Sequence, residues 1–218
     1  MTSRFSKGGR LIDRTKRLSF KFNGKNLFAY GGDTLASALL ANNQVLIGRS
    51  FKYHRPRGIV SSGIEEPNAL VSLGSGGNFE PNRSATTIEL YDGVEAISQN
   101  HLGSLEWDIG SVNNLISKIF PAGFYYKTFI NPRFAWKHIF EPTIRSAAGL
   151  GKAPKQRDPE IYEHFYAFVD LLIIGGGISG LIAAKIAAKA GAKVLILEQS
   201  PHLGGQCLVD TPEIDKVS

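Results

Sequence analysis

The chain has 218 residues, 43% of them hydrophobic, so it is long enough for one or two domains with a real core. Its single cysteine, Cys207, excludes a disulfide framework and a metal site held by cysteines. No apolar run reaches the ~20 residues of a membrane span, and the start lacks the pattern of a signal peptide, so we expect a cytoplasmic protein.

The net charge of +6 is unevenly distributed, because Lys and Arg far outnumber acidic residues before Gly58. A nucleic-acid module usually combines such bases with exposed aromatic residues, and only Phe51 and Tyr53 fit that role here. An Arg-rich, acid-poor start is also typical of a mitochondrial transit peptide, but Asp13 interrupts it. We favour a solvated basic face or a basic arm against an acidic partner subunit, and expect no nucleic-acid or membrane partner.

The first hundred residues predict a hairpin followed by a helix. Residues 18–22 alternate as a strand, Asn23-Gly24 is a strong hairpin turn, and residues 27–30 return as a second strand. Asp33 is a good N-cap for a helix that ends near Asn42. The first part of the chain therefore predicts an α+β module.

Further strands complete this predicted module. We expect one at 69–73 and another at 86–91, which would pair with 94–97 through the Asp92-Gly93 turn. A hairpin, a helix and further strands favour a compact ubiquitin-like or ferredoxin-like roll.

The middle of the chain predicts helices and an aromatic arm. Ser111 should cap a helix whose apolar positions, up to Phe120, have helical spacing. Residues 121–142 are unusually aromatic and too irregular for one amphipathic face, so they are either a connecting arm or an inter-subunit contact. Residues 149–159 are the clearest linker, and Asp158-Pro159 should start a short helix through Tyr166.

The strongest motif is a predicted strand, glycine turn, helix and second strand within residues 168–198. A mainly apolar run without alternation at 169–174 predicts a parallel strand buried on both faces. It leads into Gly175, Gly177 and Gly180, which have G-x-G-x-x-G spacing. In a dinucleotide site the first glycine allows the tight turn, the second lets the backbone approach the pyrophosphate, and the third allows close packing of helix and strand. An alanine-rich helix follows and ends at Gly191.

Glu198 follows the second apolar strand, at 194–197. An acid at this point accepts hydrogen bonds from a ribose 2′-hydroxyl. A 2′-phosphate would meet a like charge, at a cost of roughly 1–4 kcal/mol at ~4 Å. We therefore expect NAD or FAD in preference to NADP.

Other chemically active side chains are not predicted to form sites. The five histidines lack paired metal-ligand spacing. Glu65 and Glu66 are adjacent in a loop, which favours a solvated turn over a pair of catalytic carboxylates. Cys207 lacks the second cysteine of a redox pair, and we interpret it as a small packing residue.

Several strings of residues resemble the alpha subunits of heterotetrameric sarcosine oxidase over nearly the whole chain. They are GDTLASALLAN at 32–42, GRSFKYHRPRGI at 48–59, EEPNAL at 65–70, AGFYYKTF at 122–129, EPTIRSAAGLG at 141–151, and LGGQ at 203–206 together with the glycine motif.

The resemblance implies a [2Fe–2S] ferredoxin-type domain at the start. Related amine and opine dehydrogenase subunits carry cluster cysteines after an Arg-Gly equivalent to Arg57-Gly58, whereas residues 59–70 here contain none. We therefore expect no iron–sulfur cluster in this chain. The resemblance also implies NAD at the glycine motif, where related dehydrogenase subunits hold FAD, and an approach of Gly204-Gly205 to the cofactor.

The resemblance further implies a complex with beta, gamma and delta subunits that carries FAD and FMN. That complex oxidises sarcosine to glycine with formation of hydrogen peroxide, and it uses folate as acceptor of the one-carbon unit. The alternatives are a subunit of an FAD-dependent opine, proline or other amine dehydrogenase, or a truncated, non-catalytic interaction module.

Together these inferences predict a cysteine-free α+β ferredoxin-like module followed by the start of an α/β Rossmann-type FAD/NAD(P)-binding domain. The domains expected are a 2Fe-2S-type domain without cluster cysteines at 1–100, a helical and aromatic connecting arm at 101–166, and an incomplete dinucleotide-binding domain at 167–218. Because family members are longer, we expect a fragment or a truncated reading frame. No catalytic or metal-binding residue is expected. The expected cofactor-binding residues are Gly175, Gly176, Gly177, Ile178, Ser179, Gly180, Glu198, Gln199, Gly204 and Gly205.

Overall fold

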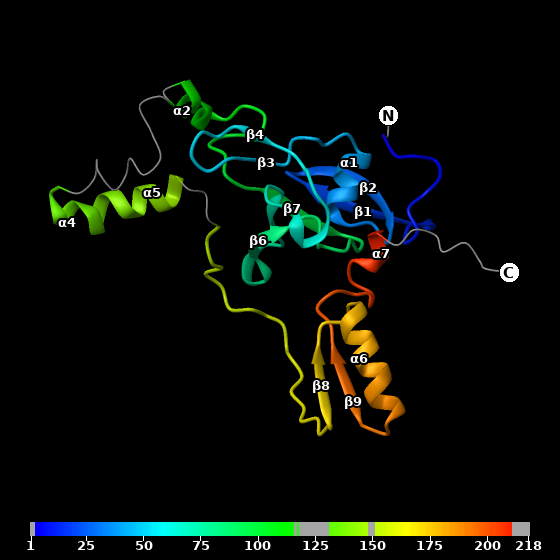
Figure 1. Ribbon diagram of the computed structural model, residues 1–218. Helices are drawn as coiled ribbons and strands as arrows, with labels where there is room; N and C mark the ends of the chain where they lie inside the picture. The colour runs from blue at the N-terminus through cyan, green and yellow to red at the C-terminus, as the bar shows by residue number, and fades with distance from the viewer. Residues whose placement is uncertain (1–2, 116, 118–130, 148–150, 211–218) are drawn as a thin grey trace. The chain divides into compact units, whose positions relative to one another are not determined.

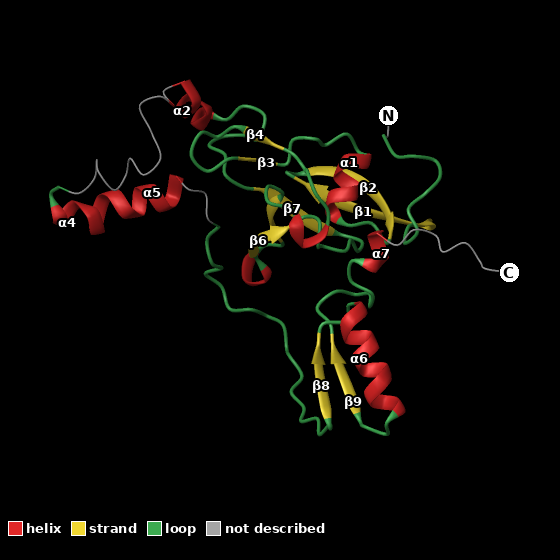
Figure 2. Cartoon of the chain, viewed as in Figure 1, coloured by secondary structure: helices red, strands yellow, loops and turns green. Residues whose placement is uncertain are grey.

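A computed structural model describes residues 3–115, 117, 131–147 and 151–210. The chain separates into two compact units, Met1–Glu160 and Ile161–Ser218 (Figure 1). The first contains a mixed sheet with helices, and the second a strand, helix and strand (Figure 2). Each unit is described separately below.

A five-stranded sheet organises the first unit. The strand order is β2-β1-β7-β5-β6, in which β1 pairs with β7 in parallel and the other pairs are antiparallel. The mixed sheet agrees with the predicted α+β class. The strands are β1 (Asp13–Phe22), β2 (Lys25–Gly31), β5 (Leu70–Leu73), β6 (Glu80–Ser84) and β7 (Val94–Ser98).

The predicted hairpin between β1 and β2 is confirmed. Asn23 and Gly24 both have positive φ, 49° and 77°, as a two-residue turn with the twist of the strands requires. Along β1, Leu18, Phe20 and Phe22 are buried while the intervening residues are exposed. The sheet thus presents one apolar face to the core.

Helix α1 (Leu35–Ala41) packs on that face, with Leu35 and Leu39 fully buried. Its N-cap is Thr34, whose hydroxyl accepts a hydrogen bond from the Ser37 N–H at 3.2 Å, so the prediction of Asp33 as the cap was wrong. The Asp33 carboxylate is instead buried, where it forms an ion pair with Arg4 and accepts bonds from the Tyr30 N–H and the Ser37 hydroxyl. Because the Asp33 carboxylate already binds these three partners, it does not cap α1.

The predicted strand at 86–91 was also wrong. Its apolar alternation reflects burial, since Ile88 and Leu90 belong to the core. Its backbone, however, bonds to the start of α1: the carbonyl of Ile88 accepts from the Leu35 N–H at 2.8 Å. Because the Ile88 carbonyl bonds to the N-terminus of α1, it does not pair with β7. That strand pairs with β1 and β5 instead.

Shorter elements complete the first unit. The strands β3 (Gly48–Arg49) and β4 (Pro56–Arg57) form a small hairpin. The helix predicted after Ser111 is present, but Asp108 caps its first turn by accepting from the Gly110 N–H, and Ser111 lies inside that turn. The other elements are the helical turns η1 (Gly63–Glu65), η2 (Gly76–Asn78) and η3 (Ile109–Ser111), and the helices α2 (Val112–Leu115), α4 (Arg133–Ala135), η5 (Trp136–Phe140) and α5 (Glu141–Ala147).

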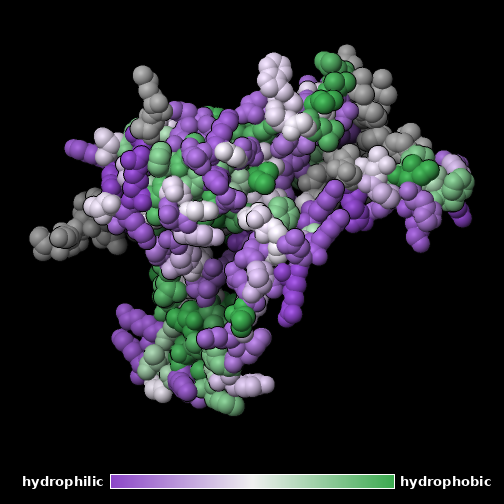
Figure 3. All heavy atoms as spheres, turned by 180° about the vertical axis from the view of Figure 1, so that it is seen from behind, coloured by the Kyte–Doolittle hydropathy of each residue, from purple (hydrophilic) through white to green (hydrophobic). Residues whose placement is uncertain are grey.

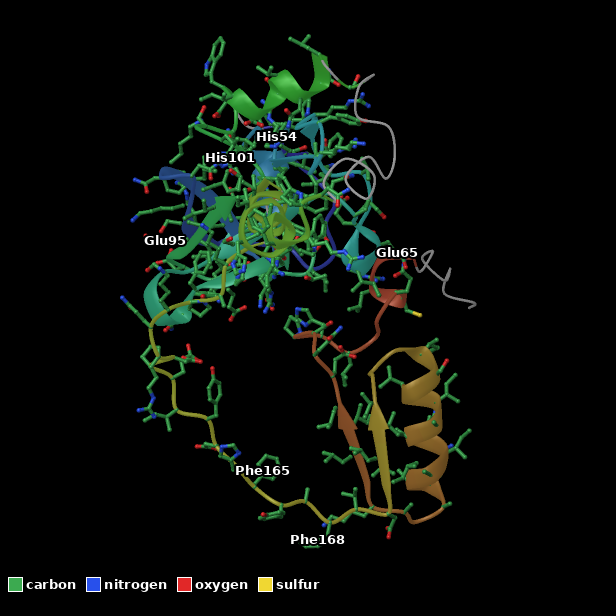
Figure 4. All side chains as sticks on the ribbon, turned by 90° about the vertical axis from the view of Figure 1, so that its left-hand side faces the viewer. His54, Glu65, Glu95, His101, Phe165 and Phe168 are labelled. Carbon is green, nitrogen blue, oxygen red and sulfur yellow. The ribbon has the colours of Figure 1, made fainter. Side chains whose placement is uncertain are left out.

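Several predictions for the middle of the chain fall outside the described residues. These are the helical positions 116 and 118–120 and the first part of the aromatic arm, 121–130. The short helix predicted through Tyr166 was wrong, because residues 151–169 have no regular secondary structure. Phe165 and Phe168 project from this extended segment and are about four-fifths exposed (Figure 4).

The second unit is a parallel strand pair with a helix. Its elements are β8 (Leu171–Ile174), α6 (Ile178–Lys189), β9 (Val194–Leu197) and the short α7 (Cys207–Asp210). The strand prediction at 169–174 supposed burial on both faces, but in this chain Leu172 and Ile174 are exposed. Apolar side chains gather on this unit (Figure 3).

Candidate functional site

The glycine motif forms the turn between β8 and the N-terminus of α6, and each glycine meets a different steric demand. Gly175 has a φ of 101°, a conformation that side chains other than glycine rarely adopt. A Cβ on Gly180 would lie 2.2 Å from the Gly175 carbonyl oxygen and 3.2 Å from Ile173, so only glycine lets α6 approach β8 this closely.

Gly177 differs from both. It is the N-cap of α6 with an ordinary φ of −69°, and a Cβ built on it would meet no atom within 4 Å. Nothing inside the described chain therefore requires glycine here. The space above it is where the free N–H groups and the positive dipole end of a helix can receive an anion.

Glu198 directly follows β9 and contacts the glycine turn. Its carboxylate accepts the Gly176 N–H at 2.6 Å and the Ser200 N–H at 2.8 Å. These hydrogen bonds, that from Ser200 first, hold the pKa of the Glu198 carboxyl below its usual value. The acid is therefore ionised at neutral pH and fixed against the glycine turn.

A second glycine turn folds against the first. The Gly204 N–H donates to the Gly176 carbonyl at 2.8 Å, and Gly204 forms a parallel bridge with Gly177. A Cβ on Gly205 would lie 3.2 Å from the Cα of Gly177. The two turns thus make close backbone contact, which a side chain at Gly205 would obstruct.

These turns border an open cavity of about 390 Å³ at the start of α6. Cys207, which the sequence predicts to be a small packing residue, forms part of its wall and is half-buried. Sequence reasoning missed Ile174, Gln206 and Cys207 as lining residues, although their proximity to the two glycine turns was a usable signal. The lining residues are Ile174, Gly175, Gly177, Ile178, Ser179, Gly180, Gly204, Gln206 and Cys207.

The structure brings together most of the predicted site residues. Six of them line the cavity, and Gly176, Glu198 and Gly205 contact the glycine turn directly. Gln199 is exposed beside Glu198 and does not line the cavity. Their role in cofactor binding remains a prediction.

A buried polar cluster in the first unit joins two loops. The Asp108 carboxylate contacts the His54 ring Nδ1 at 2.7 Å and accepts from the Leu102 and Gly110 N–H groups at 2.8 and 2.9 Å. Arg49 lies 3.9 Å away and donates to the Leu105 carbonyl. Burial alone would raise the pKa of Asp108, but these hydrogen bonds and His54 lower it.

Two family models match separate parts of the chain. Residues 15–101 match a 2Fe-2S iron-sulfur cluster binding domain, and residues 173–212 match an NAD(P)-binding Rossmann-like domain. Along the chain, a region similar to an iron–sulfur-type domain thus precedes a dinucleotide-binding motif. Within the residues that the structure describes, no group of three His, Cys, Asp or Glu side chains could hold a metal.

Sarcosine oxidase alpha subunits are similar to this chain over nearly its full length. The subunit from Rhizobium meliloti is 55% identical over 94% of the chain, and that from Corynebacterium sp. (strain U-96) is 32% identical over 90%. The resemblance to this family is therefore confirmed, and the chain corresponds to the amino-terminal portion of such a subunit. It spans 21% and 16% of the length of these two relatives.

Two further findings bear on the chain as a whole. L-proline dehydrogenase from P. horikoshii is 21% identical with a TM-score of 0.43 over 90% of this chain and 28% of that one, a value too low to carry an argument. Among the described residues, none of the helices is both long and apolar enough to cross a membrane.

The match at 15–101 conflicts with the donor atoms present. Iron–sulfur clusters of this kind are held by cysteine thiolates, yet the sole cysteine of the sequence, Cys207, lies outside these residues. The residues of the domain therefore do not fit the cluster that its family model names.

Proposed function

We propose that the second unit binds the adenosine diphosphate part of NAD or FAD in the cavity at the start of α6. The observation that carries this proposal is the open space above Gly177, bordered by the α6 N-terminus and the second glycine turn. The pyrophosphate would accept from the free N–H groups of the helix, and Glu198 would accept from the ribose hydroxyls. In this role the chain supplies binding and orientation, with no catalytic side chain of its own.

We further propose that the chain works within a sarcosine oxidase complex with beta, gamma and delta subunits. Such a complex would convert sarcosine to glycine with release of hydrogen peroxide and pass the one-carbon unit to folate, using FAD and FMN held largely outside this chain. The 55% identity to a sarcosine oxidase alpha subunit supports this proposal. A complex assembled with this chain should release peroxide with sarcosine. Oxidation of proline or an opine alone, with reduction of an added acceptor dye, would favour the dehydrogenase alternative.

Because Cys207 is the single cysteine and lies in the cavity wall, its reaction with a maleimide provides a direct binding assay. We expect NAD or FAD to slow the labelling of the 218-residue chain in a saturable way. Separate titrations with NAD and with FAD compare the two cofactors by the concentration of each that halves the labelling rate. Labelling that stays unchanged at millimolar nucleotide would contradict the proposed site.

Charge removal at Glu198 should change the choice of nucleotide. We expect NADP to protect Cys207 more weakly than NAD, and Glu198→Gln to narrow that difference in affinity by about fivefold or more, since the like-charge contact costs roughly 1–4 kcal/mol. The measurement is the concentration of each nucleotide that halves the labelling rate. A variant that keeps the full preference for NAD would show that Glu198 does not face the ribose.

A further inference from the structure

The first unit contains a loop that is folded around a buried carboxylate. Residues 59–70 connect β4 to β5, and Glu66 within them is only 6% exposed. The prediction of a solvated turn at this pair holds for Glu65, which is exposed, but was wrong for Glu66. A buried acid in a loop requires specific partners, because an ionised carboxylate is stable away from water only when it is paired or hydrogen-bonded.

Backbone N–H groups from both sides of the loop supply the pairing. One carboxylate oxygen of Glu66 accepts from the N–H groups of Val60 and Ser61, both at 2.7 Å. The other oxygen accepts from the Asn68 N–H, also at 2.7 Å. The carboxylate thereby joins the start of the loop to its end.

The charge state fits this arrangement. Burial would raise the pKa of the Glu66 carboxyl, but the N–H groups of Ser61, Asn68, Val60 and Ala69 outweigh it and hold the pKa below its usual value. Glu66 is therefore an anion at neutral pH. Its Coulomb partners are backbone dipoles, since no salt bridge to this carboxylate is found among the described residues.

A separate set of hydrogen bonds holds the tip of the loop. The Thr86 hydroxyl donates to the Gly63 carbonyl at 2.5 Å, and it also contacts the Ser84 hydroxyl at the end of β6. At the loop's entrance, a Cβ on Gly58 would lie 2.7 Å from the Val45 carbonyl oxygen, so the backbone is closely packed there. The loop is thus a closed, fully organised structure built from protein groups.

An iron–sulfur cluster gives its binding loop the same kind of centre, because a negatively charged cluster accepts hydrogen bonds at its sulfur atoms. The domain matches the 2Fe-2S model over residues 15–101 but has no thiolate there to hold one. We propose that the Glu66 carboxylate replaces the anionic cluster as the group around which loop 59–70 folds. The first unit is then a metal-free scaffold that keeps the architecture of a cluster domain.

The test compares Glu66→Gln with Glu65→Gln in the 218-residue chain. The two substitutions are chemically identical and adjacent, but only the first removes the buried charge. We expect Glu66→Gln to speed hydrogen exchange at the amides of residues 60, 61 and 68 by roughly 10- to 100-fold, since bonds to a charged acceptor are the stronger class. Glu65→Gln should leave these rates unchanged. Equal rates in both variants would overturn the proposal.

Iron analysis provides the second readout. We expect the wild-type chain to take up no iron or acid-labile sulfide during anaerobic reconstitution, and to melt at the same temperature whether or not cells were grown with an iron chelator. Stoichiometric iron and sulfide, or a chelator-dependent melting temperature, would overturn the proposal. If Glu66→Gln does not fold, Glu66→Asp keeps the charge on a shorter side chain, and we expect it to show intermediate exchange rates.

Discussion

Replacement of Gly177 by alanine is expected to weaken NAD or FAD binding by roughly 10- to 100-fold while leaving the chain folded. The added methyl group meets no protein atom within 4 Å, and the backbone already has an ordinary φ of −69°. The methyl would instead occupy the space proposed for the pyrophosphate, and overpacking of this kind costs about 1–3 kcal/mol. The measurement is the nucleotide concentration that halves the labelling rate of Cys207.

Gly180→Ala is the matched control, because it introduces the same methyl group one helical turn further along. There the Cβ would lie 2.2 Å from the Gly175 carbonyl oxygen, so α6 and β8 must move apart. We expect this variant to lose stability as well as binding, whereas Gly177→Ala should lose binding alone. If Gly177→Ala binds nucleotide normally, the pyrophosphate does not lie above the α6 N-terminus.

The glycine motif shows what sequence reasoning can predict well. Strand, turn, helix and acid lie close together in the chain, so local geometry fixes their arrangement, and Gly175 and Gly180 meet the expected steric demands. The hairpin at Asn23-Gly24 was predictable for the same reason, since the turn itself requires positive φ. These two predictions, which rest on local backbone requirements, were confirmed.

Predictions failed where a distant partner decides the outcome. Asp33 is of a residue type favoured at helix N-caps, but its buried carboxylate binds Arg4, which lies far away in the sequence. Residues 86–91 alternate like a strand, yet the Ile88 carbonyl accepts from the Leu35 N–H at the start of α1. Glu66 was indistinguishable from Glu65 in the sequence, because the N–H groups that surround it are brought together only by the folded loop.

The contact between His54 and Asp108 also joins residues far apart in the sequence, and it leads to the other large expected effect. Asp108→Asn should lower the free energy of unfolding of the first unit by about 3–5 kcal/mol, the usual cost of removing one partner of a buried ion pair, here the partner of the Arg49 guanidinium. The side chain of Asp108 is fully buried and that of Arg49 is only 9% exposed, so the variant leaves a cationic group near a neutral amide. Chemical denaturation monitored by tryptophan fluorescence would measure the loss.

The exposed Asp92 provides the matched control. Its carboxylate also accepts a backbone N–H, that of Ser19 at 2.7 Å, but water can replace this bond. We therefore expect Asp92→Asn to have a much smaller effect than Asp108→Asn. Comparable losses in the two variants would mean that burial of the His54–Asp108 pair does not determine its contribution.

The pH dependence of the free energy of unfolding distinguishes the effect of the Asp108 charge from that of its hydrogen-bond geometry. Its pKa is lower in the folded chain than in the unfolded chain, so its ionised form contributes stability above the unfolded pKa, and this contribution is lost as the pH falls through the folded value. The amide that Asp108→Asn introduces cannot titrate. The gap in unfolding free energy between wild type and this variant should therefore be largest near neutral pH and shrink on acidification below about pH 4. A gap that stays constant down to about pH 2, below the usual range of an aspartate, would attribute the loss to altered hydrogen-bond geometry and not to the buried charge.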